Sequence, residues 1–262
     1  MVGNPETDMN PTPVKRLFWD IETSPNVVLS WRVGYKINID SENILKERAV
    51  ICIGYKWQHE AKPHVITWDK KQDDKAMLAK FLKEANKADE LVAHNGDKFD
   101  LPWFLTRCAY HGLATFPSYK TADTLQWAKR RFNFNSNRLN YIAQFFGIGG
   151  KLHTEFGLWK AVCLENSPQA LARMSKYCAH DVVLLEKVWE RLSALVPHKT
   201  HAGVASKQDK WSCPHCASED VCLYGTRFSA HGTRSTRVQC KQCRRFYFIN
   251  DAVRTKYEES KK

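Results

Sequence analysis

Patterns of apolar residues divide residues 1–196 into strands and helices. Four stretches rich in β-branched and aromatic residues predict strands at residues 17–22, 49–57, 64–68 and 90–95. In four other stretches apolar residues repeat every three or four positions, which predicts helices at residues 74–87, 100–112, 136–148 and 167–195. Three successive strands followed by alternating strands and helices predict an α/β domain with helices packed on a mixed sheet.

Two carboxylates interrupt the first predicted strand. Successive side chains of a strand point to opposite faces, so Leu17, Trp19 and Ile21 share one face and Asp20 and Glu22 share the other. A polar strand face without a function would give the same short pattern. The two acids therefore need support from elsewhere in the chain.

The last predicted helix contains another acid at an apolar position. Ser167 and Pro168 predict where this helix begins. Asp181 falls in its apolar stripe, and Tyr177 precedes it by four residues, which places both side chains on one helix face. A buried carboxylate is costly unless a positive charge compensates it. The alternative is a helix boundary near His180, with Asp181 capping a second helix.

Asp100 is a fourth candidate, at the start of the helix predicted for residues 100–112. Its simpler interpretation is a helix N-cap. If the first strand, this helix and the last helix pack together, however, the four acids converge. Clusters of carboxylate oxygens suit Mg²⁺ or Mn²⁺, and two such ions roughly 4 Å apart assist displacement at phosphorus.

Three motifs make the chain similar to a known family. Residues 20–23 read D-I-E-T, residues 95–102 read N-G-D-K-F-D-L-P, and residues 177–181 read Y-C-A-H-D. In this order they resemble the motifs of the DEDD 3′–5′ exonucleases. The subtype is the tyrosine one (DEDDy), because Lys176 stands where the histidine subtype has histidine. Over roughly residues 14–196 the chain resembles the exonuclease domain of family B DNA polymerases.

The resemblance implies an RNase H-like fold, with a mixed five-stranded sheet flanked by helices, that removes nucleotides from 3′ ends. Two Mg²⁺ or Mn²⁺ ions would be held by Asp20, Glu22, Asp100 and Asp181. The hydroxyl of Tyr177 would orient the attacking water, since a phenol with a pKa near 10 is a poor base at neutral pH.

The resemblance also implies contacts with the end of the substrate. The terminal nucleotides would meet Asn95, Phe99 and the backbone around Thr23. Residues 127–135 mix cations with aromatic rings, which suits single strands. An amphipathic helix with a solvated basic face is the equally weighted alternative.

Five of the nine cysteines lie between residues 213 and 243. Two C-x₂-C pairs, Cys213/Cys216 and Cys240/Cys243, predict one structural Zn²⁺ in a zinc ribbon. Cys222, His215 and His231 are expected to be bystanders. Arginines and aromatic residues beside the cysteines indicate nucleic-acid contact, and protein docking or stabilisation is the alternative.

Composition divides the chain further. We expect a nuclease domain at residues 1–196, a linker at 197–210, the Cys₄ zinc ribbon at 211–250 and a charged tail at 251–262. Residues 197–262 contain 13 Lys+Arg and 6 Asp+Glu. The net charge of +12 favours a polyanionic partner. No apolar stretch near the start resembles a signal peptide and none is long enough to span a membrane, so we expect a cytoplasmic protein without a membrane partner.

The sequence therefore predicts a two-metal 3′–5′ exonuclease, with single-stranded DNA as the favoured substrate. A 3′–5′ exoribonuclease on the same scaffold is one alternative, because the metals contact the phosphodiester and not the sugar. A non-catalytic nucleic-acid-binding protein is the other, although such a protein has no reason to keep four acids. A replication or repair partner is possible, but the sequence identifies none.

Overall fold

The computed structural model describes residues 14–34 and 36–262. The first thirteen residues, on which the expected absence of a signal peptide rests, lie outside the described residues. The chain forms two compact units, one of Lys15–Leu195 and another that contains Val196–Lys262. Among the described residues, no helix combines the length and the apolar character needed to cross a membrane.

A mixed five-stranded sheet forms the centre of the larger unit, in the order β5-β4-β1-β6-β7. The central strand β1 is antiparallel to β4 and parallel to β6. The strands are β1 (Arg16–Thr23), β4 (Val50–Trp57), β5 (His64–Thr67), β6 (Glu90–Ala93) and β7 (Thr121–Asp123). The predicted mixed sheet is thus confirmed.

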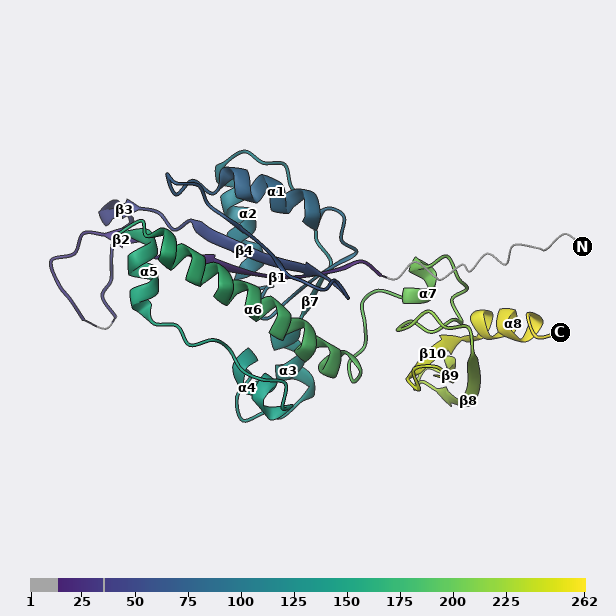
Figure 1. Cartoon of the computed structure of the whole chain (residues 1–262). Helices are drawn as coiled ribbons and strands as arrows, with labels where there is room; N and C mark the ends of the chain where they lie inside the picture. Colours follow the sequence, from purple (N-terminus) through teal and green to yellow (C-terminus); the bar gives the residue numbers. More distant parts are fainter. Residues whose placement is uncertain (1–13, 35) are drawn as a thin grey trace, which may run out of the picture. The chain divides into compact units, whose positions relative to one another are not determined.

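Helices cover both faces of this sheet, and Figure 1 shows α6 running along one face with α1 and α2 on the other. The helices are α1 (Lys75–Ala85), α2 (Asp100–Tyr110), α3 (Thr124–Arg131), α4 (Leu139–Phe145), α5 (Phe156–Cys163) and α6 (Pro168–Ser193). Leu17, Trp19 and Ile21 pack into the core beneath α1 and α2. Phe18 packs into the core beneath α6. The predicted alternation of faces along β1 is therefore confirmed, and its acids are on the α6 side.

Helix α6 is continuous, and the side chain of Ser167 caps it by accepting a hydrogen bond from the amide of Ala170. The alternative of a helix boundary near His180 is therefore wrong. Buried apolar side chains flank the acid along the helix, including Cys178, Val182 and Leu185. Their burial fixes the rotation of α6 that turns Asp181 towards the sheet.

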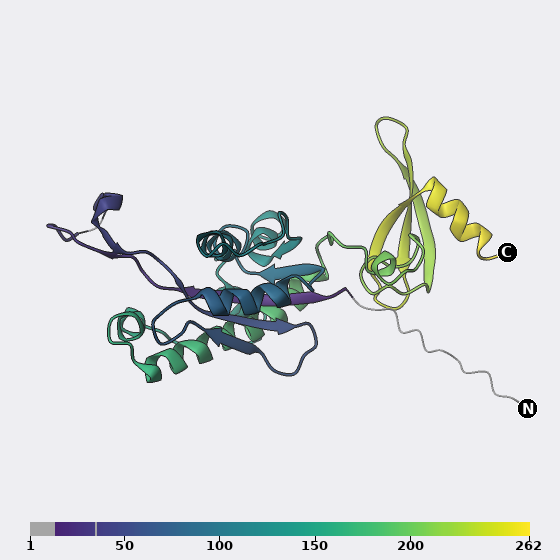
Figure 2. The same cartoon turned by 90° about the horizontal axis from the view of Figure 1, so that it is seen from above.

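A two-stranded arm connects β1 to β4. It contains β2 (Val27–Val28), η1 (Ser41–Asn43) and β3 (Ile44–Lys46), with β2 antiparallel to β3. Figure 2 shows this arm projecting away from the end of the five-stranded sheet. The two ends of the arm meet where β1 ends, because the amide of Ser24 donates to the carbonyl of Ala49 over 2.9 Å.

The smaller unit contains a three-stranded antiparallel sheet in the order β10-β9-β8. Its elements are α7 (Ala202–Ala205), β8 (Val221–Phe228), β9 (Arg234–Cys240), β10 (Phe246–Asn250) and α8 (Asp251–Glu259). Residues expected as a linker include α7, where the amide of Ala202 donates to the carbonyl of Pro214 over 2.9 Å. Residues expected as a charged tail form α8, whose Tyr257 packs against Trp211. Both segments thus pack with the cysteine-containing module.

Candidate functional site

Three of the four predicted acids meet between β1 and α6. Each of Asp20, Glu22 and Asp181 offers a carboxylate oxygen within 4.8 Å of the others. The strand supplies two of them because residues two apart share a face, and the apolar stripe of α6 turns the third towards them. Residues separated by more than 150 positions in the sequence thus form one acidic cluster.

The fourth acid, Asp100, hydrogen-bonds to β1 at the residue between Asp20 and Glu22. Helix α2 begins at Asp100, and Phe99 occupies the cap position without a side-chain capping bond. The carboxylate of Asp100 accepts a hydrogen bond from the amide of Ile21 over 3.0 Å. Asp100 is therefore not the N-cap that the simpler interpretation gave it. Its side chain joins α2 to β1 beside the acidic cluster.

A tight turn before α2 aims Asp100 at the strand. Asn95 has a φ of 76°, in the left-handed region that asparagine tolerates better than most residues. A Cβ atom at Gly96 would lie 2.4 Å from the Cβ of Ala93, so only glycine fits there. The carboxylate of Asp123 accepts hydrogen bonds from the amides of Asn95 and Asp97 over 3.0 Å and 3.3 Å. These contacts fix the turn.

Burial raises the pKa of all four acids in the site, and neighbouring carboxylates add to the shift of Asp20 and Glu22. Burial, and then the nearby Asp100, Glu22 and Asp181, hold the pKa of Asp20 well above its usual range. Burial and Asp181 raise the pKa of Glu22 to about 8. Burial is also the main reason that the pKa of Asp100 is raised to about 7. The site therefore strongly disfavours four ionised carboxylates without added positive charge.

Lys151 is a cation that contacts this cluster. Its Nζ atom lies 2.5 Å from Oδ2 of Asp181 and 3.3 Å from the hydroxyl of Tyr177. Burial alone would lower the pKa of Lys151, but Asp181 and Asp20 raise it above its usual range, so the ammonium stays charged. Burial, with Asp181, raises the pKa of Tyr177 to about 12. Tyr177 is therefore a protonated hydroxyl at neutral pH.

The cluster fits divalent cations that prefer oxygen ligands. Asp181 is 1% exposed, and its Oδ1 atom is buried with no hydrogen-bond partner among the described residues. An oxygen-only donor set of this kind suits Mg²⁺ or Mn²⁺ better than zinc. Divalent charge here would offset both the burial and the mutual repulsion of the acids.

Two hollows flank the acidic cluster. One, of about 510 Å³, is lined by Glu22, Thr23, Phe99 and Arg48, with the aromatic rings of Phe156 and Trp159. The other, of about 490 Å³, is lined by Asn95, His94, Asn140 and the cations Lys129, Arg138 and Lys151. The three predicted substrate contacts thus divide between them. Thr23 and Phe99 lie in the aromatic hollow, and Asn95 lies in the basic one.

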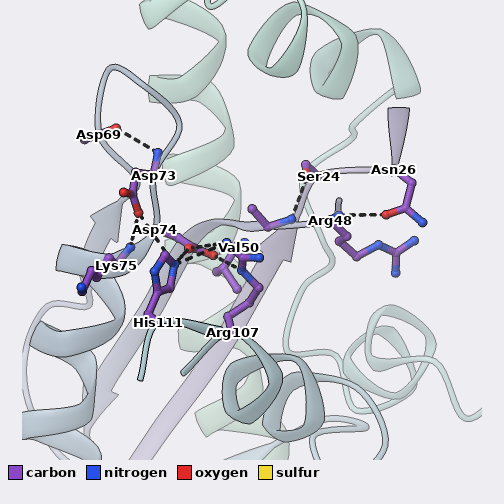
Figure 3. A network of polar contacts seen from close by, with 11 residues as sticks. Ser24, Asn26, Arg48, Val50, Asp69, Asp73, Asp74, Lys75, Arg107 and His111 are labelled. Atoms are coloured by element: carbon purple, nitrogen blue, oxygen red, sulfur yellow. Dashed lines mark hydrogen bonds and ion pairs between the residues drawn. The ribbon is translucent and has the colours of Figure 1, made fainter. Parts of the chain in front are cut away.

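A polar network fixes the backbone where β1 ends. The side chains of Asn26, Ser24 and Asp74 accept hydrogen bonds from the consecutive amides of residues 48, 49 and 50, at 2.8 Å, 2.9 Å and 2.9 Å. Figure 3 shows these contacts, with Arg107 and His111 gathered around Asp74. Val50 pairs with Thr23, directly after the irregularity that follows Glu22. The network therefore holds the end of the strand that carries the acids.

Sequence reasoning missed two basic residues of the site. Lys151 lies in a loop that no periodicity covers, and its neighbour Gly150 is anchored because its carbonyl lies 2.8 Å from Nε2 of His180. Arg48 stands at the foot of the arm, with its guanidinium 4.8 Å over the ring of Trp103. Neither position carries a pattern in the sequence, because both depend on long-range packing.

The basic stretch at residues 127–135 contributes mainly to the core. Trp127, Phe132 and Phe134 pack against the cluster beneath α6. Of its cations, Lys129 lines the basic hollow. Trp127 lies on α3, whereas Phe132 and Phe134 follow its end, so the alternative of an amphipathic helix holds only for the first part of this stretch.

The four predicted cysteine ligands converge in the smaller unit. Their Sγ atoms lie within 4.8 Å of one another, and the pairs Cys213/Cys243 and Cys216/Cys240 are each 3.6 Å apart. A disulfide needs about 2.05 Å. Tetrahedral zinc with bonds of about 2.3 Å places its sulfurs about 3.8 Å apart. The cluster is therefore compatible with a zinc ribbon, and its group does not include Cys222.

Both C-x₂-C turns have the same backbone geometry. The residues that follow them, Ala217 and Arg244, have φ of 62° and 63°. The amide of the first cysteine in each turn donates to the carbonyl five residues later, Cys213 to Ser218 and Cys240 to Arg245. Two matched turns that present four sulfurs to one point are typical of a Cys₄ metal site.

The sheet order, with helices on both faces, defines the class as an RNase H-like α/β fold. The family model described as the RNase_H superfamily matches residues 37–193, more than half of the chain, and the chain belongs to this superfamily. The match begins after β1, so it does not include Asp20 and Glu22.

The structure is also similar to the family B DNA polymerase from the hyperthermophilic archaeon Pyrobaculum calidifontis. The TM-score is 0.55 at 16% sequence identity, over 70% of this chain and 25% of the polymerase. The chain thus spans about a quarter of that polymerase's length. At this identity the likeness shows a shared fold. Among curated proteins, none matches the chain.

Proposed function

We propose that this chain is a metal-dependent 3′–5′ exonuclease that hydrolyses phosphodiester bonds of single-stranded nucleic acid, with DNA favoured. The convergence of four carboxylates from β1, α2 and α6 carries the proposal. Membership of the RNase_H superfamily supports nuclease activity in general. The direction of digestion is supported by the resemblance of the three motifs to those of DEDD exonucleases of the tyrosine subtype.

The carboxylates of Asp20, Glu22, Asp100 and Asp181 would hold two Mg²⁺ or Mn²⁺ ions. When bound, such ions supply a nucleophile at neutral pH and stabilise the charge that develops on the phosphoryl oxygens. Tyr177 keeps its proton and orients the attacking water through its hydroxyl. Lys151, whose Nζ atom lies 3.3 Å from the hydroxyl of Tyr177, would contact an oxygen of the scissile phosphate, where its charge would favour the transition state.

The hollows on either side of the cluster suit two different parts of a single strand, its terminal base and the phosphates that precede it. Phe99, Phe156 and Trp159 provide aromatic surface for the terminal base beside Glu22. The backbone of Thr23 would contact the 3′-hydroxyl. Cations suit the phosphates of the preceding nucleotides, and Asn95 lies among them in the second hollow.

In the smaller unit, Cys213, Cys216, Cys240 and Cys243 would hold one structural Zn²⁺. The closed cage of four thiolates leaves no open coordination position, so its contribution is to folding. We propose residues up to 196 as the exonuclease domain and residues 211–250 as the zinc ribbon, with α7 of the expected linker and α8 of the expected tail packed against the ribbon.

Digestion of 5′-labelled single strands of DNA and RNA, in Mg²⁺, Mn²⁺ or chelator, tests the proposal. A metal-dependent ladder that shortens one nucleotide at a time from the 3′ end is expected, with DNA cut faster. Faster digestion of RNA would assign an exoribonuclease. Binding of both strands without any cleavage would assign a non-catalytic binding protein.

A further inference from the structure

The exposed face of the three-stranded sheet in the smaller unit combines aromatic rings with guanidinium groups. Strand β9 contributes Arg237, which lies opposite Phe248 of β10 and Gly225 of β8. The other face of the sheet holds the buried side chains of Val238, Tyr247 and Ile249. Because side chains alternate along a strand, Arg237 and Phe248 point away from this core, towards solvent.

Direct contacts join these side chains into one surface. The guanidinium of Arg237 lies 5.2 Å from the ring centre of Tyr224 and 5.9 Å from that of Phe246. These two rings meet edge to face at 5.0 Å. Arg227 lies 3.8 Å over the ring of Phe248. We name this surface the ribbon face, defined by Tyr224, Arg227, Arg237, Phe246 and Phe248.

The rings of the ribbon face stay in solvent although they are large and apolar. Tyr224 is 60% exposed, Phe246 45% and Phe248 44%. Their burial is not needed for the core, which forms on the opposite face of the sheet. Exposed apolar side chains gathered on one surface mark an interaction site.

The charge around the ribbon face selects a polyanion as that ligand. Residues 221–250 contain no aspartate or glutamate. Of their six cations, Arg227 and Arg237 lie on the ribbon face, whereas Arg234 and Lys241 pair with Asp251 and Asp220 of the flanking segments. Cations meet phosphates while exposed rings stack on unpaired bases, and a duplex keeps its bases stacked inside. A protein partner would need acidic side chains to meet these cations.

We propose that the ribbon face binds single-stranded nucleic acid, with bases stacked on Tyr224, Phe246 and Phe248 and phosphates held by Arg227 and Arg237. This binding involves no hydrolysis and none of the four acids. It deepens the proposed function by giving the chain a second contact with its substrate, which would keep long strands associated while their ends are removed.

Fluorescence anisotropy of the full chain with labelled 30-mers tests the proposal. Oligo-dT and oligo-rU are titrated separately in Ca²⁺ without Mg²⁺ or chelator, and their length is checked afterwards on a gel. Cleavage is not needed for this readout, so failure here and failure of the exonuclease proposal give different results. A 30-base-pair duplex is the competitor.

Tyr224→Ala, Phe246→Ala and Phe248→Ala are each expected to weaken single-strand binding about fivefold or more, since each removes a stacking ring. Arg237→Gln should reduce the slope of log affinity against log salt by about 0.7. Phe248→Leu keeps an apolar side chain without a ring and should weaken binding as the alanine does. The matched controls are Phe116→Ala, an exposed ring, and Arg254→Gln, a partly exposed cation paired with Glu258, both outside this face, and both should bind like wild type.

Unfolding temperature and zinc content of each variant establish that the module is folded. The proposal is overturned if the folded ring variants bind both single strands with wild-type affinity, which would leave the face to a protein partner. It is also overturned if the duplex competes as well as a single strand does. Preference between the dT and rU strands decides which nucleic acid the face favours.

Discussion

The carboxylate of Asp100 accepts a hydrogen bond from the backbone amide of Ile21, over 3.0 Å, at the residue that separates the two acids of β1. One bond thus fixes the start of α2 against the middle of the acidic cluster. The same side chain carries a raised pKa, mainly because it is buried. Structural support and proposed metal binding therefore fall on one residue.

Stability should depend on the protonation of Glu22 when no divalent ion is added. The pKa of Glu22 rises from 4.5 to about 8 in the folded protein. The folded state then keeps a proton that the unfolded chain has released, so stability falls as pH rises between these two values. The unfolding temperature of wild type should therefore fall more steeply from pH 5 to pH 8 than that of Glu22→Gln.

Added Mg²⁺ should reverse this loss, because ligand that binds only the folded state stabilises it. At pH 8 the gain in unfolding temperature should be larger for wild type than for Glu22→Gln. Parallel pH curves, with equal gains in Mg²⁺, would contradict the role given to Glu22.

Tyr177→Phe should slow single-turnover cleavage by about 10²–10⁴ and leave substrate binding nearly unchanged, since only the hydroxyl that orients the water is lost. The pKa of about 12 further predicts that the wild-type rate shows no loss from Tyr177 ionisation between pH 7 and pH 10. Tyr141→Phe removes another partly buried hydroxyl, which accepts a hydrogen bond from Asn135. If Tyr177→Phe and this control cleave at the same rate, the hydroxyl of Tyr177 has no role in cleavage and the residue contributes only to helix packing.

Asp74→Ala should destabilise the fold by about 3–5 kcal/mol, because it leaves a buried arginine without its partner. Arg107 donates two hydrogen bonds to Asp74, over 2.8 Å and 2.9 Å. Burial would raise the pKa of Asp74, but the bonds from Arg107, Val50 and His111 lower it below 3.8. Its contribution is therefore complete above pH 3.8 and is lost as pH falls through the lowered value.

Chemical denaturation at neutral pH measures the Asp74 effect. Glu84→Ala is the control, because it breaks an exposed pair with Lys87 that is worth no more than about 1 kcal/mol. A loss for Asp74→Ala as small as that of the control would mean that the network does not hold the end of β1.

Removal of residues 198–262 should leave a folded nuclease with a similar kcat on short oligonucleotides and weaker binding to long ones. The cysteine module has its own small core, while the larger unit keeps its sheet and helices. The lost segment contains most of the cations of the smaller unit, so the salt dependence of binding should also decrease. Equal affinity and salt slope for both proteins on long strands would exclude the module from nucleic-acid binding.

The spacing of apolar residues within single strands and helices predicts which face of each element carries the acids. Alternation placed Asp20 and Glu22 on one face of β1, and the apolar stripe of α6 placed Asp181 opposite them. Strand β7 has three residues, too few to show any period, and its place in the sheet followed only from the resemblance.

The other features that escaped prediction depend on contacts between distant residues. Lys151 reaches Asp181 from a loop thirty residues earlier, and the partners of Asp74 come from β4 and α2. Helices α7 and α8 lie in polar segments, and contacts with the cysteine module hold them in place.

The most direct test of the account is single-turnover cleavage of a 5′-labelled single strand by Asp100→Asn. Asparagine keeps an oxygen that can accept the bond from Ile21 but removes the charge proposed to hold a divalent ion. The variant should match wild type in unfolding temperature within a few degrees and cleave at least about 100-fold more slowly in Mg²⁺, because a bound metal supplies several kcal/mol of transition-state stabilisation. The control Asp97→Asn alters an exposed acid of the same turn and should cleave like wild type. Wild-type cleavage by folded Asp100→Asn would contradict the assignment of this cluster as a metal-dependent nuclease site.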